Sequence, residues 1–229
     1  MGCSSGPDII EDGLVLCLDA ASKRSYPGTG TVWTDLAGSN NGTLTNSPTF
    51  SSDNGGAFTF DGTNDYVLLP SNLITGNGPL SLSFVFSADS NSYGADEKLF
   101  SYGTDADGGL LSFTVEGTGF RWRHIGGNIT YGAGQISVNT VTFVTMVLDS
   151  DATTTDNMKC YIDAVEYVGS RTGGSDQTIN IGTTDERYIA RFRSTAYWSG
   201  KVFMFQYYNR ALSDEEIRRN YLSTKERFA

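Results

Sequence analysis

WSGKVFMFQYYNRALSDEEIRRNY, residues 198–221, leads from an apolar strand into a capped helix. Residues 201–208 are dominated by apolar side chains, a pattern typical of a strand buried in a sandwich. Ser213 and Glu216 form an S-x-x-E capping box, which indicates the start of a helix. We expect this helix over residues 213–226. Its apolar stripe is narrow, so the helix is stable only when it docks against the rest of the protein.

Before this segment, the chain consists of short apolar runs separated by turns rich in Gly, Asn, Asp and Ser. Residues 80–87 (LSLSFVFS) alternate between apolar residues and serines, as a strand with one buried face does. Similar runs occupy residues 13–20, 109–116, 140–149, 158–168 and 177–182. We therefore predict an all-β fold, in which two antiparallel sheets form a jelly-roll sandwich with one short C-terminal helix.

The chain shows no linker and no change of composition, and its 229 residues suit one large all-β domain. We expect a single domain over residues 13–229. Residues 1–12 (MGCSSGPDIIED) precede the first expected strand. We predict that they form an N-terminal arm outside the sandwich, which anchors the protein in an assembly.

The composition excludes several classes of partner. A net charge of −10, from 26 acidic and 16 basic residues, repels phosphate backbones, so we expect no nucleic-acid partner. One histidine (His124) and three widely spaced cysteines exclude a zinc site. The first 13 residues lack the apolar core of a signal peptide, and no apolar run is long enough to span a bilayer. We therefore expect no membrane insertion.

Several motifs, taken in order, resemble a known family. Residues 13–50 contain an opening strand, a Tyr-Pro-Gly loop and the segment VWTDL. FTFDGTNDYVLLP (58–70) resembles a family hairpin, MKCYIDA (158–164) carries Ala164 in place of a turn glycine, and residues 198–221 close the domain. Together they resemble the laminin-G-like, concanavalin-A-like lectin/glucanase jelly roll found in bacteriophage virion structural proteins. The resemblance implies the sandwich fold, and Ala164 leaves the type of its turn open because alanine resists positive φ.

The loop FDGTNDYV is the best candidate for a metal site. Asp61, Asn64 and Asp65 place three oxygen ligands within five residues, a grouping that Ca²⁺ favours. The resemblance implies a calcium ion at the rim of the sandwich, which in some members helps to bind sugar. The alternative is that these residues only form a hairpin turn, whose backbone angles Asp, Gly and Asn favour. Residues 105–109 and 149–156 are weaker clusters of the same kind.

Four aromatic residues are candidates for binding glycans, because the C–H face of a sugar ring packs on an aromatic face while nearby polar groups bind its hydroxyls. They are Trp33, Trp122, Tyr131 and Trp198. The alternative is that these side chains fill the core of the sandwich or its rim.

Enzyme motifs are missing from the sequence, which contains no Glu-x-Asp-x-x-Glu strand of retaining glucanases, no G-x-S-x-G, no P-loop and no H-E-x-x-H. We predict that the protein is not an enzyme. The resemblance implies a virion structural protein on the virion surface, as a capsid decoration, head fibre or tail-associated protein. It would be present in repeated copies, contact capsid or tail subunits, and bind surface glycans for host adhesion. A soluble calcium-dependent lectin module and a polysaccharide hydrolase or lyase are the alternatives.

Overall fold

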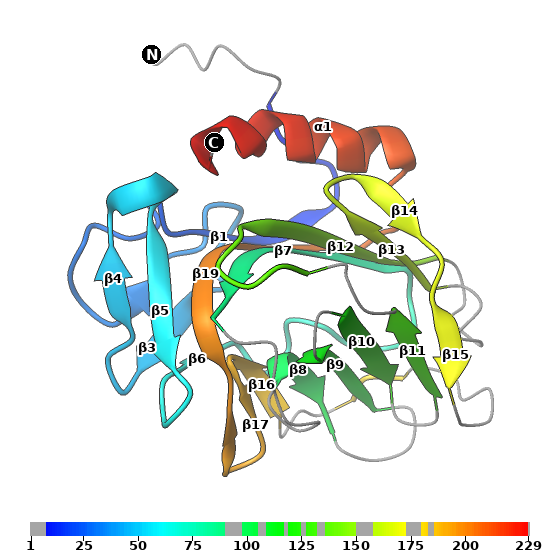
Figure 1. The fold of residues 1–229 in the computed structure, drawn as a ribbon, viewed down its shortest axis with the longest axis horizontal. Coiled ribbons are helices and arrows are strands. Elements are labelled where there is room, and N and C mark those ends of the chain that lie inside the picture. Colours follow the sequence, from blue (N-terminus) through cyan, green and yellow to red (C-terminus); the bar gives the residue numbers. More distant parts are fainter. Residues whose placement is uncertain are drawn as a thin grey trace.

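The computed structural model describes residues 8–89, 98–104, 109–116, 119–124, 127–131, 136–149, 158–172, 180–182 and 186–228. Within these residues the chain forms two large antiparallel sheets that face each other, a small two-stranded sheet, and one C-terminal α-helix (Figure 1). The predicted all-β jelly-roll sandwich with a short C-terminal helix is confirmed.

The first sheet has eight strands within the described residues, in the order β14-β13-β12-β7-β19-β5-β4, and β1 pairs with β19. The strands are β1 (Leu14–Asp19), β4 (Thr49–Ser51), β5 (Ala57–Asp61), β7 (Leu80–Ala88), β12 (Thr142–Leu148), β13 (Met158–Ile162), β14 (Val165–Tyr167) and β19 (Ser199–Tyr208). β19 lies at the centre of this sheet and pairs with β1, β5 and β7, so its apolar sequence is buried.

The second sheet has the order β15-β11-β10-β9-β8-β16-β6-β3-β2 in the described part of the chain. Its strands are β2 (Val32–Trp33), β3 (Gly42–Thr45), β6 (Tyr66–Leu68), β8 (Lys98–Gly103), β9 (Leu110–Glu116), β10 (Gly119–His124), β11 (Gly127–Tyr131), β15 (Ser170–Thr172) and β16 (Glu186–Ile189). A short hairpin, β17 (Arg191–Phe192) and β18 (Ala196–Tyr197), follows β16 directly.

Aromatic side chains fill the space between the two large sheets. Phe84 of β7 stacks on Phe205 of β19, with ring centroids 4.6 Å apart, and lies 6.0 Å from Phe113 of the opposite sheet. All three rings are buried, and each contributes about 1.5–3 kcal/mol to stability relative to exposure. The alternation predicted for residues 80–87 therefore places the phenylalanines inside and the serines on the outer face.

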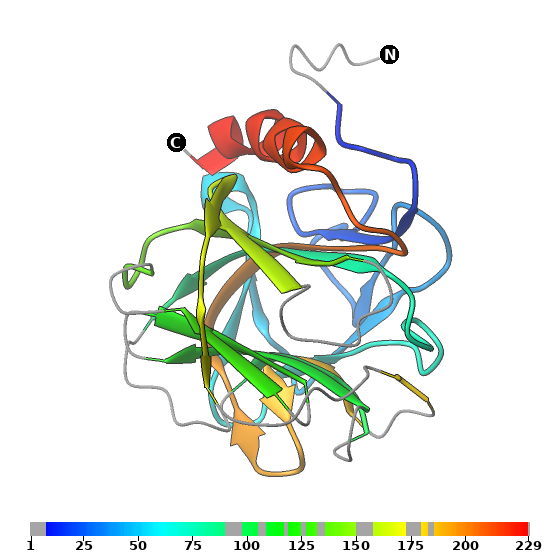
Figure 2. The ribbon, with the colours of Figure 1, turned by 90° about the vertical axis from the view of Figure 1, so that its right-hand side faces the viewer.

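The C-terminal helix, α1 (Asp214–Thr224), lies across the outer face of the first sheet and continues into a 3-10 turn, η3 (Lys225–Phe228) (Figures 1 and 2). The predicted capping box is present, since Ser213 Oγ accepts the Glu216 N–H and the Glu216 carboxylate accepts the Ser213 N–H. Arg210 donates two hydrogen bonds to the same carboxylate, and this pairing lowers the pKa of Glu216 to about 2.

The helix docks on the sheet through a small apolar cluster. Its buried members are Val147, Tyr161, Tyr208, Leu212 and Ile217. The Tyr161 hydroxyl also donates to Asp214 Oδ1 at 2.7 Å, which ties the first turn of the helix to β13. This cluster supplies the docking that a short helix requires. None of the described helices is long and apolar enough to cross a membrane.

Residues 8–12 are attached to the helix. The Ile10 N–H donates to Asn220 Oδ1 at 2.8 Å, the Asn220 side-chain amide donates to the Tyr208 hydroxyl at 3.0 Å, and that hydroxyl donates to the Ile10 carbonyl at 3.1 Å. Arg219 Nε donates to the Asp8 carbonyl. The anchoring arm at residues 1–12 stays a prediction: its described part, residues 8–12, precedes β1 and joins neither sheet, but polar groups of the helix and β19 bind it. Residues 1–7 lie outside the described part.

The turn between β13 and β14 keeps positive φ without glycine. Asp163 and Ala164 have φ of 50° and 64°, and Ile162 pairs with Val165 across them. Two residues with positive φ form a type I′ turn, whose twist suits a tight hairpin. The alanine therefore accepts a strained conformation that glycine adopts freely.

Candidate functional site

The three tryptophans predicted to bind glycans are buried. Trp33, Trp122 and Trp198 are each 0% exposed, so no indole face is available to a sugar. Trp33 packs edge-on against Phe58, at 4.8 Å between ring centroids, and Trp122 packs against Phe113 at 5.2 Å. The prediction is wrong for these three residues, because the register of β2 and β10 turns Trp33 and Trp122 toward the core and Trp198, between β18 and β19, packs against Phe86. The side chain of the fourth candidate, Tyr131, lies outside the described part.

The Asp61 loop closes as a turn. Asp61 Oδ1 accepts the backbone N–H groups of Thr63, Asn64 and Asp65, at 2.8, 3.2 and 3.5 Å. The Thr63 N–H is the main reason that the pKa of Asp61 falls below its ordinary value. Burial, followed by the charge of Asp61, raises the pKa of Asp65. The geometry agrees with a turn, but the turn is not a hairpin, because β5 and β6 belong to different sheets and do not pair with each other.

Calcium binding by Asp61, Asn64 and Asp65 stays a prediction. The two carboxylates repel each other, and a cation between them would relieve that repulsion. In the part of the chain that the structure describes, no three His, Cys, Asp or Glu side chains gather as a metal-binding group. The weaker clusters fall mostly on residues 105–108 and 150–156, outside the described part.

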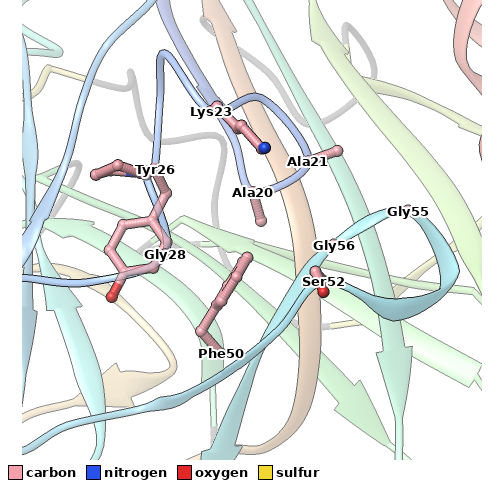
Figure 3. A pocket seen from close by; sticks show the side chains of 10 residues that line it. Ala20, Ala21, Lys23, Tyr26, Gly28, Phe50, Ser52, Gly55 and Gly56 are labelled. Carbon is pink, nitrogen blue, oxygen red and sulfur yellow. The ribbon is translucent and has the colours of Figure 1, made fainter.

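A pocket of about 430 Å³ opens between the end of β1 and the segment that joins β4 to β5 (Figure 3). Residues 20–28 form one side and residues 50–56 the other, and we call it the Phe50 pocket. The loop beside it is held by Ser25, whose hydroxyl accepts the Asp19 N–H and donates to the Thr34 carbonyl. These bonds give the pocket a fixed wall.

Two aromatic rings form the apolar part of the Phe50 pocket. Tyr26 and Phe50 meet edge to face with centroids 4.9 Å apart, and Phe58 packs behind both rings. Tyr26 is buried and donates its hydroxyl to the Gly30 carbonyl, whereas Phe50 is half-buried and points into the pocket, toward Ala20 (Figure 3). Trp33 packs against Phe58, so this predicted residue supports the wall from inside the core.

The rim of the Phe50 pocket is polar. Lys23 and Ser52 line it and are exposed. Gly56 has φ of 76°, and a Cβ at that position would lie 2.7 Å from the Ala21 Cα. Glycine is therefore needed for residues 50–56 to approach β1 this closely. The pocket combines an aromatic wall with a hydroxyl and an ammonium group, an arrangement that suits a small amphipathic ligand.

The sequence interpretation missed Lys23, Tyr26, Phe50 and Ser52 as site residues. The available signals were weak: Tyr26 precedes a Pro-Gly turn, and Phe50 precedes the loop SSDNGG. An aromatic residue beside a turn is as common in a core rim as in a site. Tyr26 and Phe50 are recognised as site residues only in the folded protein, where residues 20–28 and 50–56 come together.

Comparison with known protein families identifies the superfamily of the chain. The sequence pattern of the concanavalin A-like lectin/glucanases superfamily matches residues 61–218. The chain belongs to this superfamily. The residues that line the Phe50 pocket precede the matched region, so the match does not extend to the site. A search of curated proteins found no sequence relative.

Solved structures share the fold at low sequence identity. The Trypanosoma rangeli sialidase in complex with sialic acid superposes with a TM-score of 0.66 at 19% identity, over 94% of this chain and 33% of the sialidase. The chain thus spans about a third of the length of that enzyme. Domain 4 of an extracellular GH43 arabinanase from Geobacillus stearothermophilus, solved with arabinotriose, gives a TM-score of 0.65 at 15% identity, over 93% and 100% of the two chains.

The receptor-binding domain of botulinum neurotoxin D also shares the fold. Its TM-score is 0.66 at 13% identity, over 92% of this chain and 52% of the toxin domain. These identities show a common sandwich and nothing finer, because one fold hosts many functions.

Proposed function

We propose that this protein is a non-catalytic carbohydrate-binding module, which holds a sugar ring in the Phe50 pocket. The observation that carries the proposal is a half-buried aromatic face inside a pocket whose rim is polar. The volume of about 430 Å³ lies in the range of small-ligand sites, about 300–1,000 Å³, and suits one or two sugar rings. The arabinanase domain solved with arabinotriose shows a similar sandwich beside a sugar.

The pocket can contact both the apolar face and the hydroxyl groups of a sugar ring. The C–H face would pack on Phe50, and ring hydroxyls would reach the Lys23 ammonium and the Ser52 hydroxyl at the rim. Tyr26 stiffens the aromatic wall, because its hydroxyl is already bound to the Gly30 carbonyl. The wall therefore needs little rearrangement on binding, which limits the entropy lost.

The test is a titration of the purified protein with a panel of neutral mono- and disaccharides, followed by NMR. We expect millimolar or tighter binding, with the largest shift changes at residues 20–28 and 50–56. Phe50→Leu keeps the apolar volume but removes the flat face, and it should weaken binding about fivefold, or ~1 kcal/mol. Ser52→Trp should block the pocket.

Phe143→Leu is the matched control, since Phe143 is another half-buried phenylalanine and lies on β12 under the helix. It should leave sugar affinity unchanged. Equal loss in Phe50→Leu and Phe143→Leu, or shift changes confined to other residues, would overturn the assignment of the pocket. Product release from the same panel would overturn the proposal that the module does not catalyse.

We further propose that the module is displayed on a phage virion, as a decoration, head fibre or tail-associated protein. The order of motifs from residue 13 to residue 221, which resembles virion modules, supports this proposal. Mass spectrometry of gradient-purified particles should find the chain at a constant ratio to the capsid or tail subunits. Deletion of residues 1–7 should release it from particles while residues 8–12 and the fold stay intact. Particles that keep the shortened chain would exclude these residues as the anchor.

A further inference from the structure

A second feature lies on the outer face of the nine-stranded sheet, away from the Phe50 pocket. Tyr66 of β6 and Tyr188 of β16 are neighbours there, because Tyr188 pairs with Leu68, whose side chain shares the face of Tyr66. Their rings meet edge to face at 5.4 Å between centroids. Tyr197 of β18 adds a third ring, 6.4 Å from Tyr66. All three tyrosines are half-buried.

The β17–β18 hairpin is fixed onto this face by polar contacts. The Ser101 hydroxyl donates to the Arg191 carbonyl at 2.8 Å, and the Arg193 N–H donates to Glu186 Oε2 at 2.9 Å. Phe192 is fully buried, with the Lys98 ammonium 3.8 Å from its ring centroid. In Figure 1, β17 lies next to β16 on this outer side. These contacts hold the β17–β18 hairpin in a fixed position on the outer face of the sheet.

Arg191 occupies the centre of the tyrosines. Its guanidinium carbon lies 4.5 Å from the ring centroids of both Tyr66 and Tyr188, and 5.7 Å from that of Tyr197. Its Nε donates to the Arg193 carbonyl at 2.6 Å, which fixes the plane of the group. Within the described part of the chain, no residue accepts a hydrogen bond from the two Nη groups of Arg191. The guanidinium group of Arg191 is therefore held in one orientation, and its two Nη groups can still donate hydrogen bonds to a ligand.

Among the residues that the structure describes, no carboxylate forms an ion pair with Arg191. Glu186, the acidic residue of β16, instead accepts the Arg193 N–H at 2.9 Å. Residues 186–193 contain three arginines and one glutamate, in a protein whose net charge is −10. A local positive group in an acidic protein attracts a small anion, whereas the overall charge repels a polyanion.

We propose that Arg191, Tyr66, Tyr188 and Tyr197 form a second site, the Arg191 surface, which binds a sugar that carries a carboxylate. The two Nη groups of Arg191 match the two oxygens of a carboxylate, the geometry that this fork recognises best. The hydroxyls of Tyr66 and Tyr188 have no partner in the described residues and are available to ring hydroxyls. This inference rests on the proposed function in one respect, namely that the protein binds sugars; the two sites share no residue.

The experiment compares methyl β-D-glucuronide with methyl β-D-glucoside, two probes that differ only in the carboxylate. NMR titration of the full chain should show glucuronide shifts at residues 66, 188, 191 and 197. Its affinity there should be at least tenfold higher than that of the glucoside, and added salt should weaken it. Acetate alone should bind at least tenfold more weakly than the glucuronide. Equal shifts for the two sugars, or an equal affinity for acetate, would overturn the proposal.

Variants separate this surface from the Phe50 pocket. Arg191→Gln should lower glucuronide affinity at least fivefold, and Arg191→Lys should do so while the positive charge stays. Arg218→Gln, the same change at an exposed arginine of α1, should have no effect. Phe50→Leu should leave glucuronide binding intact. The test of the Arg191 surface therefore holds even if the Phe50 pocket is found not to bind sugar. Unchanged glucuronide binding in folded Arg191→Gln would refute the site. If that variant does not fold, the comparison of glucuronide with glucoside on the wild-type protein still tests the proposal.

Discussion

Asn220→Ala should detach the N-terminal segment from the helix at a large cost in stability. Asn220 is buried, and its side chain accepts from the Ile10 N–H and donates to the Tyr208 hydroxyl. The Tyr208 hydroxyl donates in turn to the Ile10 carbonyl, so three segments share one ring of hydrogen bonds. The alanine variant leaves the partly buried Ile10 N–H without its acceptor, at about 1–3 kcal/mol, and removes the donor to the Tyr208 hydroxyl, which still donates to the Ile10 carbonyl, at about 1 kcal/mol. We expect a total loss of about 2–4 kcal/mol.

The assay is urea unfolding followed by tryptophan fluorescence, with hydrogen exchange read at the Ile10 amide. Tyr208→Phe and the double variant complete a mutant cycle, whose coupling energy should be about 1 kcal/mol because the two side chains contact each other. Exchange at Ile10 should accelerate at least tenfold in Asn220→Ala. Arg218→Ala, at an exposed position of the same helix, should stay within about 0.5 kcal/mol of the wild type.

Three results would refute this reasoning. A loss below about 1 kcal/mol would mean that water replaces the lost partners at little cost. Unchanged exchange at Ile10 would mean that residues 8–12 are held by other contacts. Strictly additive effects of Asn220→Ala and Tyr208→Phe would mean that the hydrogen bonds act independently.

Three further changes test local features. Glu216→Gln removes a carboxylate whose pKa is lowered to about 2 from an ordinary 4.5, so the stability it adds is present above pH 4.5 and lost as pH falls toward 2. The gap to the wild type in urea unfolding should shrink from about 1.5–3 kcal/mol at pH 7 toward zero at pH 2, and a constant gap would contradict the pairing with Arg210. Ala164→Gly should raise the unfolding free energy by about 0.5–1 kcal/mol, because relief of positive-φ strain exceeds the entropy cost of glycine, and a lower melting temperature would exclude this account. Asp61→Ala should lower stability by about 1–2 kcal/mol even in chelator, since the lost acceptor serves the turn itself, whereas a loss seen only with added Ca²⁺ would assign the carboxylate to the metal.

Local sequence signals predicted the elements well. The alternation at residues 80–87 and the apolar run at 201–208 both form strands, and the Ser213–Glu216 box begins the helix. These signals work because strand periodicity and capping depend on residues two to four positions apart. The helix ends at Thr224 instead of residue 226, a difference within the fraying of a last turn.

The sites could not be predicted in the same way, because they join residues far apart in the chain. Trp122 and Tyr188 are both aromatic residues in strands, yet the sheet packing buries the first and leaves the second half-exposed. The Phe50 pocket exists only because Gly56 allows two distant loops to meet. The sequence by itself determined the all-β class and the capped helix. Tertiary packing alone decided which aromatic faces meet solvent, because burial depends on what the rest of the chain places against each side chain.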